Sequence, residues 1–117
     1  EAALKAKEAG VDGIIVSNHG RRVVDHTPAP IEVLPEIKEV VGDSLKIFVD
    51  GAIRSGVDII KAISLGADAV LIARPFAISV YGAGHIGVEK LKSEFKSALL
   101  MTNTKSVKDI DETKVYF

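Results

Sequence analysis

The stretch that decides the fold of this chain spans residues 14–25 and reads Ile14-Ile15-Val16-Ser17-Asn18-His19-Gly20-Arg21-Arg22-Val23-Val24-Asp25. Its first three residues are β-branched and apolar, a composition typical of a strand buried on both faces of a parallel sheet. The stretch then changes abruptly to polar and titratable residues with a glycine. A buried strand that delivers a His and an Arg at its carboxyl end indicates the rim of an active site in a parallel α/β protein.

Helices and strands are predicted to alternate along the rest of the chain. Helical spacing of apolar residues predicts a helix before the first strand (12 or 13 to 17) and another over residues 31–41. A second buried strand is expected at 46–51, followed by a helix that Ser55 caps together with Asp58 and that runs to Gly66. A third strand is expected at 69–73, then helix, chiefly over 88–101, and a polar tail at 104–117 that wraps the surface.

One sequence pattern occurs twice and indicates how the strands are arranged. Residues 10–16 and 66–72 both read Gly-x-Asp-small-apolar-apolar-apolar, each at a helix-to-strand turn. Helix and strand therefore alternate as repeated units, which produces a parallel sheet with right-handed connections. The carboxyl ends of all strands then meet on one side, which brings together Asn18-His19, Asp50-Gly51 and Ala73-Arg74.

The number of strands bounds the domain. Three parallel strands cannot close a barrel, which needs about eight, and they leave two open edges. The first residues show no signal-peptide pattern and no initiating Met, so we expect a chain truncated at its start. Residues 1–117 are accordingly expected to form a single partial domain, the carboxyl-terminal part of an α/β barrel.

Composition excludes several classes of function. A chain of 117 residues with 47% apolar and 26% charged residues is typical of a globular protein. A net charge of -1 gives no argument for nucleic acid or an acidic membrane surface as partner, and no apolar run approaches the roughly 20 residues of a membrane span. The absence of Cys excludes disulfides and thiolate chemistry, and no spacing of His, Asp and Glu suggests a metal site. The expected compartment is the cytoplasm.

The loop after the first strand is the first candidate site. Histidine titrates near neutrality, which suits His19 to take a proton from a substrate. Arg22 offers a planar fork that pairs with a carboxylate through two hydrogen bonds, and Gly20 lets the backbone turn sharply between them. The alternative is a solvated loop with a structural His.

The turns after the second and third strands are the second candidate site. Small residues there expose backbone N–H groups, and each turn carries an Arg, in Asp50-Gly51-Ala52-Ile53-Arg54 and in Ala73-Arg74. Such turns make a phosphate cradle, which barrels often build after their last two strands. The alternative is that both Arg side chains form surface ion pairs with Asp58 or Asp68.

These motifs together resemble a known family. Ser17-Asn18-His19-Gly20, followed by Arg22 and Asp25, is similar to the signature of the FMN-dependent α-hydroxy acid oxidases and dehydrogenases, the glycolate oxidase and lactate oxidase group. The segment from Asp50 to Arg54 is similar to that family's Asp-Gly-Gly-x-Arg, and Ala73-Arg74-Pro75 is similar to its Gly-Arg-Pro. The resemblance covers essentially the whole chain.

The resemblance implies the carboxyl-terminal part of a TIM (β/α)8 barrel with about three parallel strands alternating with helices. It implies that His19 is the active-site base and that Arg22 holds the carboxylate of a small L-2-hydroxy acid such as lactate or glycolate. The turns would bind the phosphate of FMN, with Arg54 and Arg74 as its cationic partners. The product would be the 2-oxo acid, with two electrons passed to the flavin.

The resemblance also implies an assembly and leaves alternatives open. Family members often form tetramers, so a homo-oligomer is expected, and the family's flavin-ring contacts come from earlier strands, so the isolated fragment is expected to be inactive. Ala52 and Ala73 stand where the family has Gly, and a positive φ at either adds strain of about 1 kcal/mol. Two alternatives remain: another FMN barrel such as type 2 isopentenyl diphosphate isomerase, and a catalytically incomplete fragment that binds phosphate.

Overall fold

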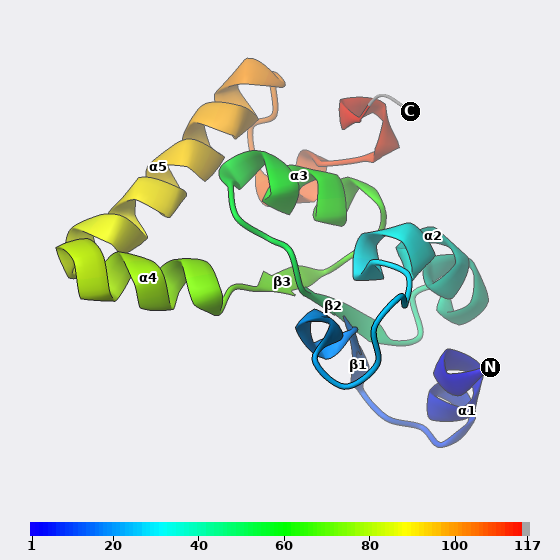
Figure 1. Cartoon of the computed structure of the whole chain (residues 1–117). Coiled ribbons are helices and arrows are strands. Elements are labelled where there is room, and N and C mark those ends of the chain that lie inside the picture. Colours follow the sequence, from blue (N-terminus) through cyan, green and yellow to red (C-terminus); the bar gives the residue numbers. More distant parts are fainter. Residues whose placement is uncertain (116–117) are drawn as a thin grey trace.

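The structure is a computed structural model that describes residues 1–115. Helices and strands alternate from the N-terminus, as the repeated pattern predicts (Figure 1). With 3-10 helices marked η, the elements are α1 (Ala2–Glu8), β1 (Gly13–Ser17), η1 (His19–Arg21), α2 (Pro30–Val41), β2 (Lys46–Asp50), α3 (Gly56–Ser64), β3 (Ala69–Leu71), α4 (Arg74–Ala83), α5 (His85–Met101), η2 (Val107–Asp109) and η3 (Glu112–Lys114).

The three strands form one parallel sheet in the order β1-β2-β3. The register pairs Ser17 with Asp50 and Asp50 with Leu71, so the strands end at a common edge. This arrangement confirms the predicted α/β class and the predicted side for the strand ends. The third strand is shorter than predicted: it ends at Leu71 rather than residue 73, because Ala73 already has φ of -107° and ψ of -78° and caps α4.

Helices α1, α2 and α3 cover one face of the sheet and form the core with it. Leu34 from α2 and Ile47 from β2 are fully buried at 0% exposure. Burying each such side chain contributes about 1.5–3 kcal/mol relative to leaving it in water. The buried core cluster consists of Val16, Leu34, Val41, Leu45, Ile47, Val49, Ile53, Ala62 and Ala67.

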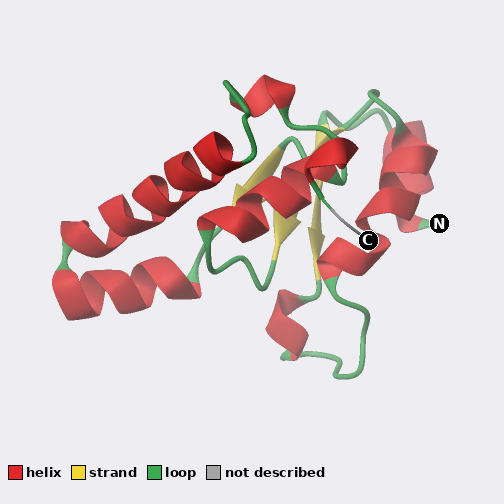
Figure 2. Cartoon of the chain, turned by 90° about the horizontal axis from the view of Figure 1, so that it is seen from above, coloured by secondary structure: helices red, strands yellow, loops and turns green. Residues whose placement is uncertain are grey.

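The other face of the sheet is open, so the expectation that the strands are buried on both faces is wrong for this structure. Ile15, Phe48 and Leu71 project from this face and are 61%, 36% and 38% exposed. Helices α2 and α3, which follow β1 and β2, lie on the same side of the sheet as α1, and α4 projects away after β3, which leaves the alternate residues uncovered (Figure 2). The strands are therefore apolar on both faces, but a layer of helices covers only one of them.

The ends of α3, α4 and α5 follow from local sequence. The Ser55 hydroxyl accepts from the Asp58 backbone N–H at 3.3 Å, and the Asp58 carboxylate accepts from the Ser55 N–H at 3.0 Å, which confirms the predicted cap. Gly84, with φ of 58°, separates α4 from α5. The two helices pack side by side as a hairpin that projects from the sheet (Figures 1 and 2). The sequence predicts helix in this region but not this division.

The tail after α5 is partly buried rather than simply lying on the surface. Thr104 is 5% exposed and Ile110 is 9% exposed, and η3 contacts α3. The last two residues of the predicted tail, 116 and 117, lie outside the described residues. Among residues 1–115, no helix is both long enough and apolar enough to cross a bilayer.

Candidate functional site

The predicted site residues gather at the carboxyl edge of the sheet because its strands are parallel. A small hollow of about 60 Å³ lies at this edge. All the residues predicted to bind a cofactor line it, and Gly20 from the loop after β1 lines it as well. The predicted cofactor set is Asp50, Gly51, Ala52, Ile53, Arg54, Ala73 and Arg74.

The loop after β1 is folded by its own polar side chains. The Asn18 Oδ1 atom accepts from the Gly20 N–H at 3.1 Å and caps η1, while the Asn18 amide donates to the carbonyl of Pro28 at 3.3 Å. Gly20 has φ of 64°, which glycine adopts without steric cost. His19 also has a positive φ, 53°, which a residue with a Cβ adopts only when its surroundings hold it there.

The structure brings the predicted base and the predicted substrate Arg into contact. The Arg22 Nη2 atom lies 3.0 Å from the His19 Nε2 atom. A guanidinium carries only donors, so the His19 Nε2 atom is the acceptor in this contact. Both side chains are exposed to solvent. The pair therefore places an imidazole nitrogen and a guanidinium next to each other at the carboxyl edge of the sheet.

The two turns of the predicted phosphate cradle lie beside this loop. A Cβ placed on Gly20 would lie 3.2 Å from the Arg74 Nη2 atom, so the guanidinium reaches the loop that follows β1. Arg54 and Arg74 are both exposed and line the hollow. Ile53 is 6% exposed and belongs to the core, so this residue offers only its main chain to a ligand.

The alternative role for the two Arg side chains does not occur in the structure. Within residues 1–115, neither Arg54 nor Arg74 forms an ion pair with Asp58 or Asp68. The Asp58 carboxylate accepts from the backbone N–H of Arg54 at 3.1 Å. Asp68 forms its ion pair with Lys46, at 2.7 Å. The carboxylates of Asp58 and Asp68 therefore do not neutralise the charges of the Arg54 and Arg74 guanidinium groups.

The two alanines that replace family glycines differ in backbone conformation. Ala52 has φ of 62°, in the left-handed region, whereas Ala73 has φ of -107°. The strain anticipated from the sequence therefore arises at Ala52 alone.

Ser17 and Asp50 form a contact at the site that was not predicted from the sequence. The Ser17 hydroxyl donates to the Asp50 carboxylate at 2.7 Å and accepts from the His19 N–H at 3.0 Å. Each of Ser17 and Asp50 is the last residue of its strand. The repeat predicts parallel strands, and parallel strands bring their last residues to a common edge. This signal could have indicated the contact between Ser17 and Asp50.

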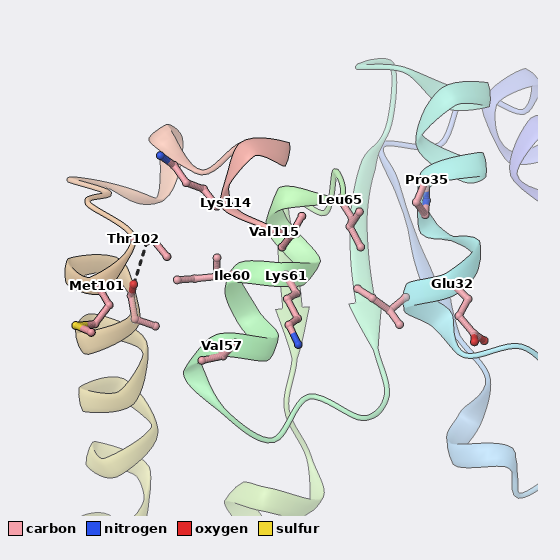
Figure 3. A pocket seen from close by; sticks show the side chains of 12 residues that line it. Glu32, Pro35, Val57, Ile60, Lys61, Leu65, Met101, Thr102, Lys114 and Val115 are labelled. Atoms are coloured by element: carbon pink, nitrogen blue, oxygen red, sulfur yellow. Dashed lines mark hydrogen bonds between the residues drawn. The ribbon is translucent and has the colours of Figure 1, made fainter. Parts of the chain in front are cut away.

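A larger hollow lies away from these residues. Its volume is about 690 Å³, and it lies between α2, α3, α5 and the tail (Figure 3). Apolar side chains such as Val57, Ile60 and Met101 form its walls, with Lys61 and Lys114 also lining it. None of the predicted site residues lines it, so the carboxyl edge of the sheet remains the candidate site.

Comparison with known proteins gives a consistent result. The family model described as FMN-dependent dehydrogenase matches residues 1–116. A peroxisomal (S)-2-hydroxyacid oxidase of Arabidopsis thaliana is 46% identical over 119 residues, which cover 98% of this chain and 33% of that protein. 2-Hydroxyacid oxidase 1 of Mus musculus is 48% identical over 117 residues, covering 97% of this chain and 32% of that protein.

Solved structures show the same fold. A structure of mandelate oxidase with benzoyl-formic acid matches with a TM-score of 0.85 at 42% identity, over 92% of this chain and 33% of that one. A flavocytochrome b2 variant with sulfite bound matches with a TM-score of 0.88 at 36% identity, over 96% of this chain and 31% of that one. The chain spans about a third of the length of these relatives. It therefore corresponds to part of a TIM barrel, as predicted.

Proposed function

The chain belongs to the FMN-dependent dehydrogenase family, and from that membership we propose that the whole protein oxidises a small L-2-hydroxy acid, such as lactate or glycolate, to the 2-oxo acid. Relatives named as 2-hydroxyacid oxidases and as an L-lactate dehydrogenase of Xanthomonas axonopodis support the substrate class. The contact of 3.0 Å between His19 and Arg22 carries the proposal, because it joins the two groups that such a substrate requires.

Arg22 and His19 act on different parts of the substrate. The Arg22 fork binds the carboxylate through two parallel hydrogen bonds, which fixes the orientation of the carbon that is oxidised. His19 then accepts a proton from the substrate at Nε2, the nitrogen that lies beside the Arg22 guanidinium. His19 therefore serves as base and Arg22 as the substrate-binding residue.

Substrate binding also changes the partner of Arg22. In the structure, Arg22 donates to the same His19 nitrogen that must accept the proton. A carboxylate is a stronger, bidentate partner for a guanidinium than a neutral imidazole. Carboxylate binding is therefore expected to draw Arg22 away and leave the lone pair of Nε2 available.

The hollow beside this pair fits the phosphate of FMN. It is small, about 60 Å³, which suits a phosphoryl group and not a flavin ring. Arg54 and Arg74 supply two positive charges, and Gly51 and Ala52, which also line the hollow, have the positive φ found in turns that bind anions through their main chain. FMN, when bound, supplies the acceptor for the two electrons that the substrate loses.

The relatives bear on the alternatives as well. Their names favour hydroxy acid oxidation over a type 2 isopentenyl diphosphate isomerase. Some are peroxisomal enzymes, so they do not support the cytoplasmic location predicted from the sequence. A homo-oligomer and an inactive isolated fragment remain predictions.

Anaerobic reduction of the flavin tests this function. The whole protein, loaded with FMN, is mixed with L-lactate or glycolate in the absence of oxygen, and the visible absorbance of the flavin is followed. We expect L-lactate and glycolate to bleach the flavin of the wild-type protein and D-lactate not to do so. We expect no bleaching in His19→Gln, although this variant retains its flavin. Arg22→Lys, which keeps the charge but loses the fork, is expected to raise KM. Bleaching in His19→Gln would remove the base assignment, and no bleaching of the wild-type protein by either acid would contradict the proposed function.

A further inference from the structure

Ser17 occupies the junction between the two halves of the candidate site. It is the last residue of β1 and lies directly opposite Asp50, the last residue of β2. Its hydroxyl donates to the Asp50 Oδ2 atom at 2.7 Å and accepts from the His19 backbone N–H at 3.0 Å. One side chain thus connects the turn of the phosphate cradle to the main chain of the base. Among residues 1–115, no other hydrogen bond engages the Asp50 carboxylate.

His19 depends on this connection because its backbone conformation is unfavourable. Its φ of 53° lies in the left-handed region, where a residue with a Cβ is unfavourable. The side chain of Asn18 bonds to Gly20 and Pro28 but not to His19, whose carbonyl accepts from the Arg22 N–H at a longer 3.4 Å. The Ser17 hydroxyl is the group that accepts from the His19 N–H and fixes the orientation of that peptide.

We propose that Ser17 is a positioning residue for the base, which ties the main chain of His19 to the carboxylate of Asp50. The donor and acceptor functions of its hydroxyl are both used by protein atoms, so Ser17 acts through His19 and not on the substrate. The contact between His19 Nε2 and Arg22 Nη2 depends on the path of this main chain, since the two residues lie three positions apart in one short turn. The positioning of His19 by Ser17 does not depend on the proposed function; only the expected effect on turnover rests on it.

Nuclear magnetic resonance on the whole protein tests the positioning directly. Ser17→Ala is expected to speed hydrogen exchange at the His19 amide and to remove the contact between the His19 ring and the Arg22 guanidinium. Ser17→Thr keeps a hydroxyl at an exposed position and is expected to restore both. The amides of Val16 and Val49, in the core of the sheet, report that the fold is intact. Unchanged exchange and an unchanged ring contact in Ser17→Ala would overturn the proposal.

The chain offers a matched control for the loss of one Ser–Asp hydrogen bond. Ser106 donates to the Asp109 carboxylate at 2.9 Å in an exposed turn of the tail. Ser106→Ala removes a bond of the same type away from the strand ends and is expected to leave His19 unchanged. An equal effect of Ser106→Ala on His19 would show that the response is not specific to Ser17 and would overturn the proposal.

Turnover in the whole protein gives the second readout. Because misplacing a reacting group by about 1 Å costs roughly 100-fold in rate, we expect Ser17→Ala to lower kcat about 10- to 100-fold, with a smaller change in KM and with flavin retained. Wild-type kcat in Ser17→Ala, or loss of its flavin, would overturn the positioning role. If the wild-type protein does not oxidise 2-hydroxy acids, the proposed function fails, while the magnetic resonance result still decides the role of Ser17.

Discussion

Ala52 is strained by its backbone conformation, and replacing it with Gly tests that strain. A φ of 62° brings its Cβ close to the backbone, and Gly removes this conflict. Gly also gains entropy in the unfolded chain, which offsets part of the benefit. We expect Ala52→Gly to raise the free energy of unfolding by about 0.5–1 kcal/mol, measured by urea denaturation.

Ala73 is the matched control for this substitution. It also replaces a glycine of the family pattern, but its φ of -107° is favourable for alanine. Ala73→Gly relieves no strain and is expected to lower the free energy of unfolding by up to about 1 kcal/mol. A stabilisation by Ala73→Gly that matches that of Ala52→Gly would contradict the assignment of strain to Ala52.

At the residue scale, short-range arrangements of the site were predictable and the backbone conformations were not. His19 and Arg22 lie one turn apart, so their proximity follows from the sequence. The sign of φ at Ala52 does not, because both alanines read as small residues in similar turns. The contact between Ser17 and Asp50 depends on strand register, which needs the ends of both strands to the residue.

Asp68 joins the turn between α3 and β3 to the start of β2. Its carboxylate accepts from the Ile47 N–H at 2.9 Å and pairs with the Lys46 ammonium at 2.7 Å. Burial raises the pKa of Asp68, but the bonds from Lys46 and Ile47 together outweigh it and hold the pKa below its usual value. The ionised form therefore stabilises the folded state at a pH above the unfolded pKa, and this contribution is lost as the pH falls through the lowered folded pKa.

Asp68→Asn tests this linkage. We expect the substitution to lower the free energy of unfolding by about 1 kcal/mol at neutral pH, since it weakens a charged hydrogen bond. The difference from wild type should shrink as the pH falls below the unfolded pKa of Asp68 and vanish once the pH lies below its lowered folded pKa, where the wild-type carboxyl is protonated as well. Asp12 occupies the same position of the repeated pattern, but its carboxylate makes no hydrogen bond within residues 1–115, so Asp12→Asn should have little effect. A difference for Asp68→Asn that persists in acid would contradict the electrostatic explanation.

Gly56 allows α3 to approach α5 closely. A Cβ at this position would lie 2.3 Å from the Phe95 backbone nitrogen, and the backbone of α5 cannot move aside locally. We expect Gly56→Ala to lower the free energy of unfolding by about 1–3 kcal/mol through overpacking. Gly82, inside α4, has nothing within 4 Å of such a Cβ, so Gly82→Ala should stabilise the helix by up to about 1 kcal/mol. Thermal unfolding of both variants measures the contrast, and equal effects would contradict it.

At the scale of elements, the sequence predicts the repeated helices and strands well and the region after β3 less well. Periodic apolar residues and the cap at Ser55 define α2 and α3 locally. The division of α4 from α5 depends on the left-handed turn at Gly84 and on Gly87, where a Cβ would lie 2.3 Å from the Ser79 Cβ. That close approach is a tertiary contact, which the helical pattern of either segment does not contain.

The whole molecule matches the prediction of a partial barrel, because three parallel strands are too few to close one. The sequence alone did not reveal which face lacks a covering layer, since the strands are apolar on both sides. The structure shows that the uncovered face carries Ile15, Phe48 and Leu71 and, at its carboxyl edge, Ser17 and Asp50. The candidate site and the open apolar face therefore belong to the same side of the sheet.

A matched pair of isoleucines tests which face holds the chain together. Ile15 is 61% exposed on the open face, and Ile47 is 0% exposed on the helix-covered face. Ile15→Lys should change the free energy of unfolding by no more than about 0.5 kcal/mol, as at other surface positions, whereas Ile47→Lys buries an unpaired charge and should unfold the chain.

An exposed apolar patch of this kind promotes association and binds hydrophobic dyes. Ile15→Lys should therefore reduce dye fluorescence and self-association, both measurable on the 117-residue chain by fluorescence and sedimentation. The difference between the effects of Ile15→Lys and Ile47→Lys should disappear in the whole protein, because the interior of a closed barrel is filled with packed side chains. There, Ile15→Lys is expected to prevent folding much as Ile47→Lys does. If Ile15→Lys unfolded the isolated chain, or left the whole protein as stable as wild type, the open face would not be the inner face of a barrel.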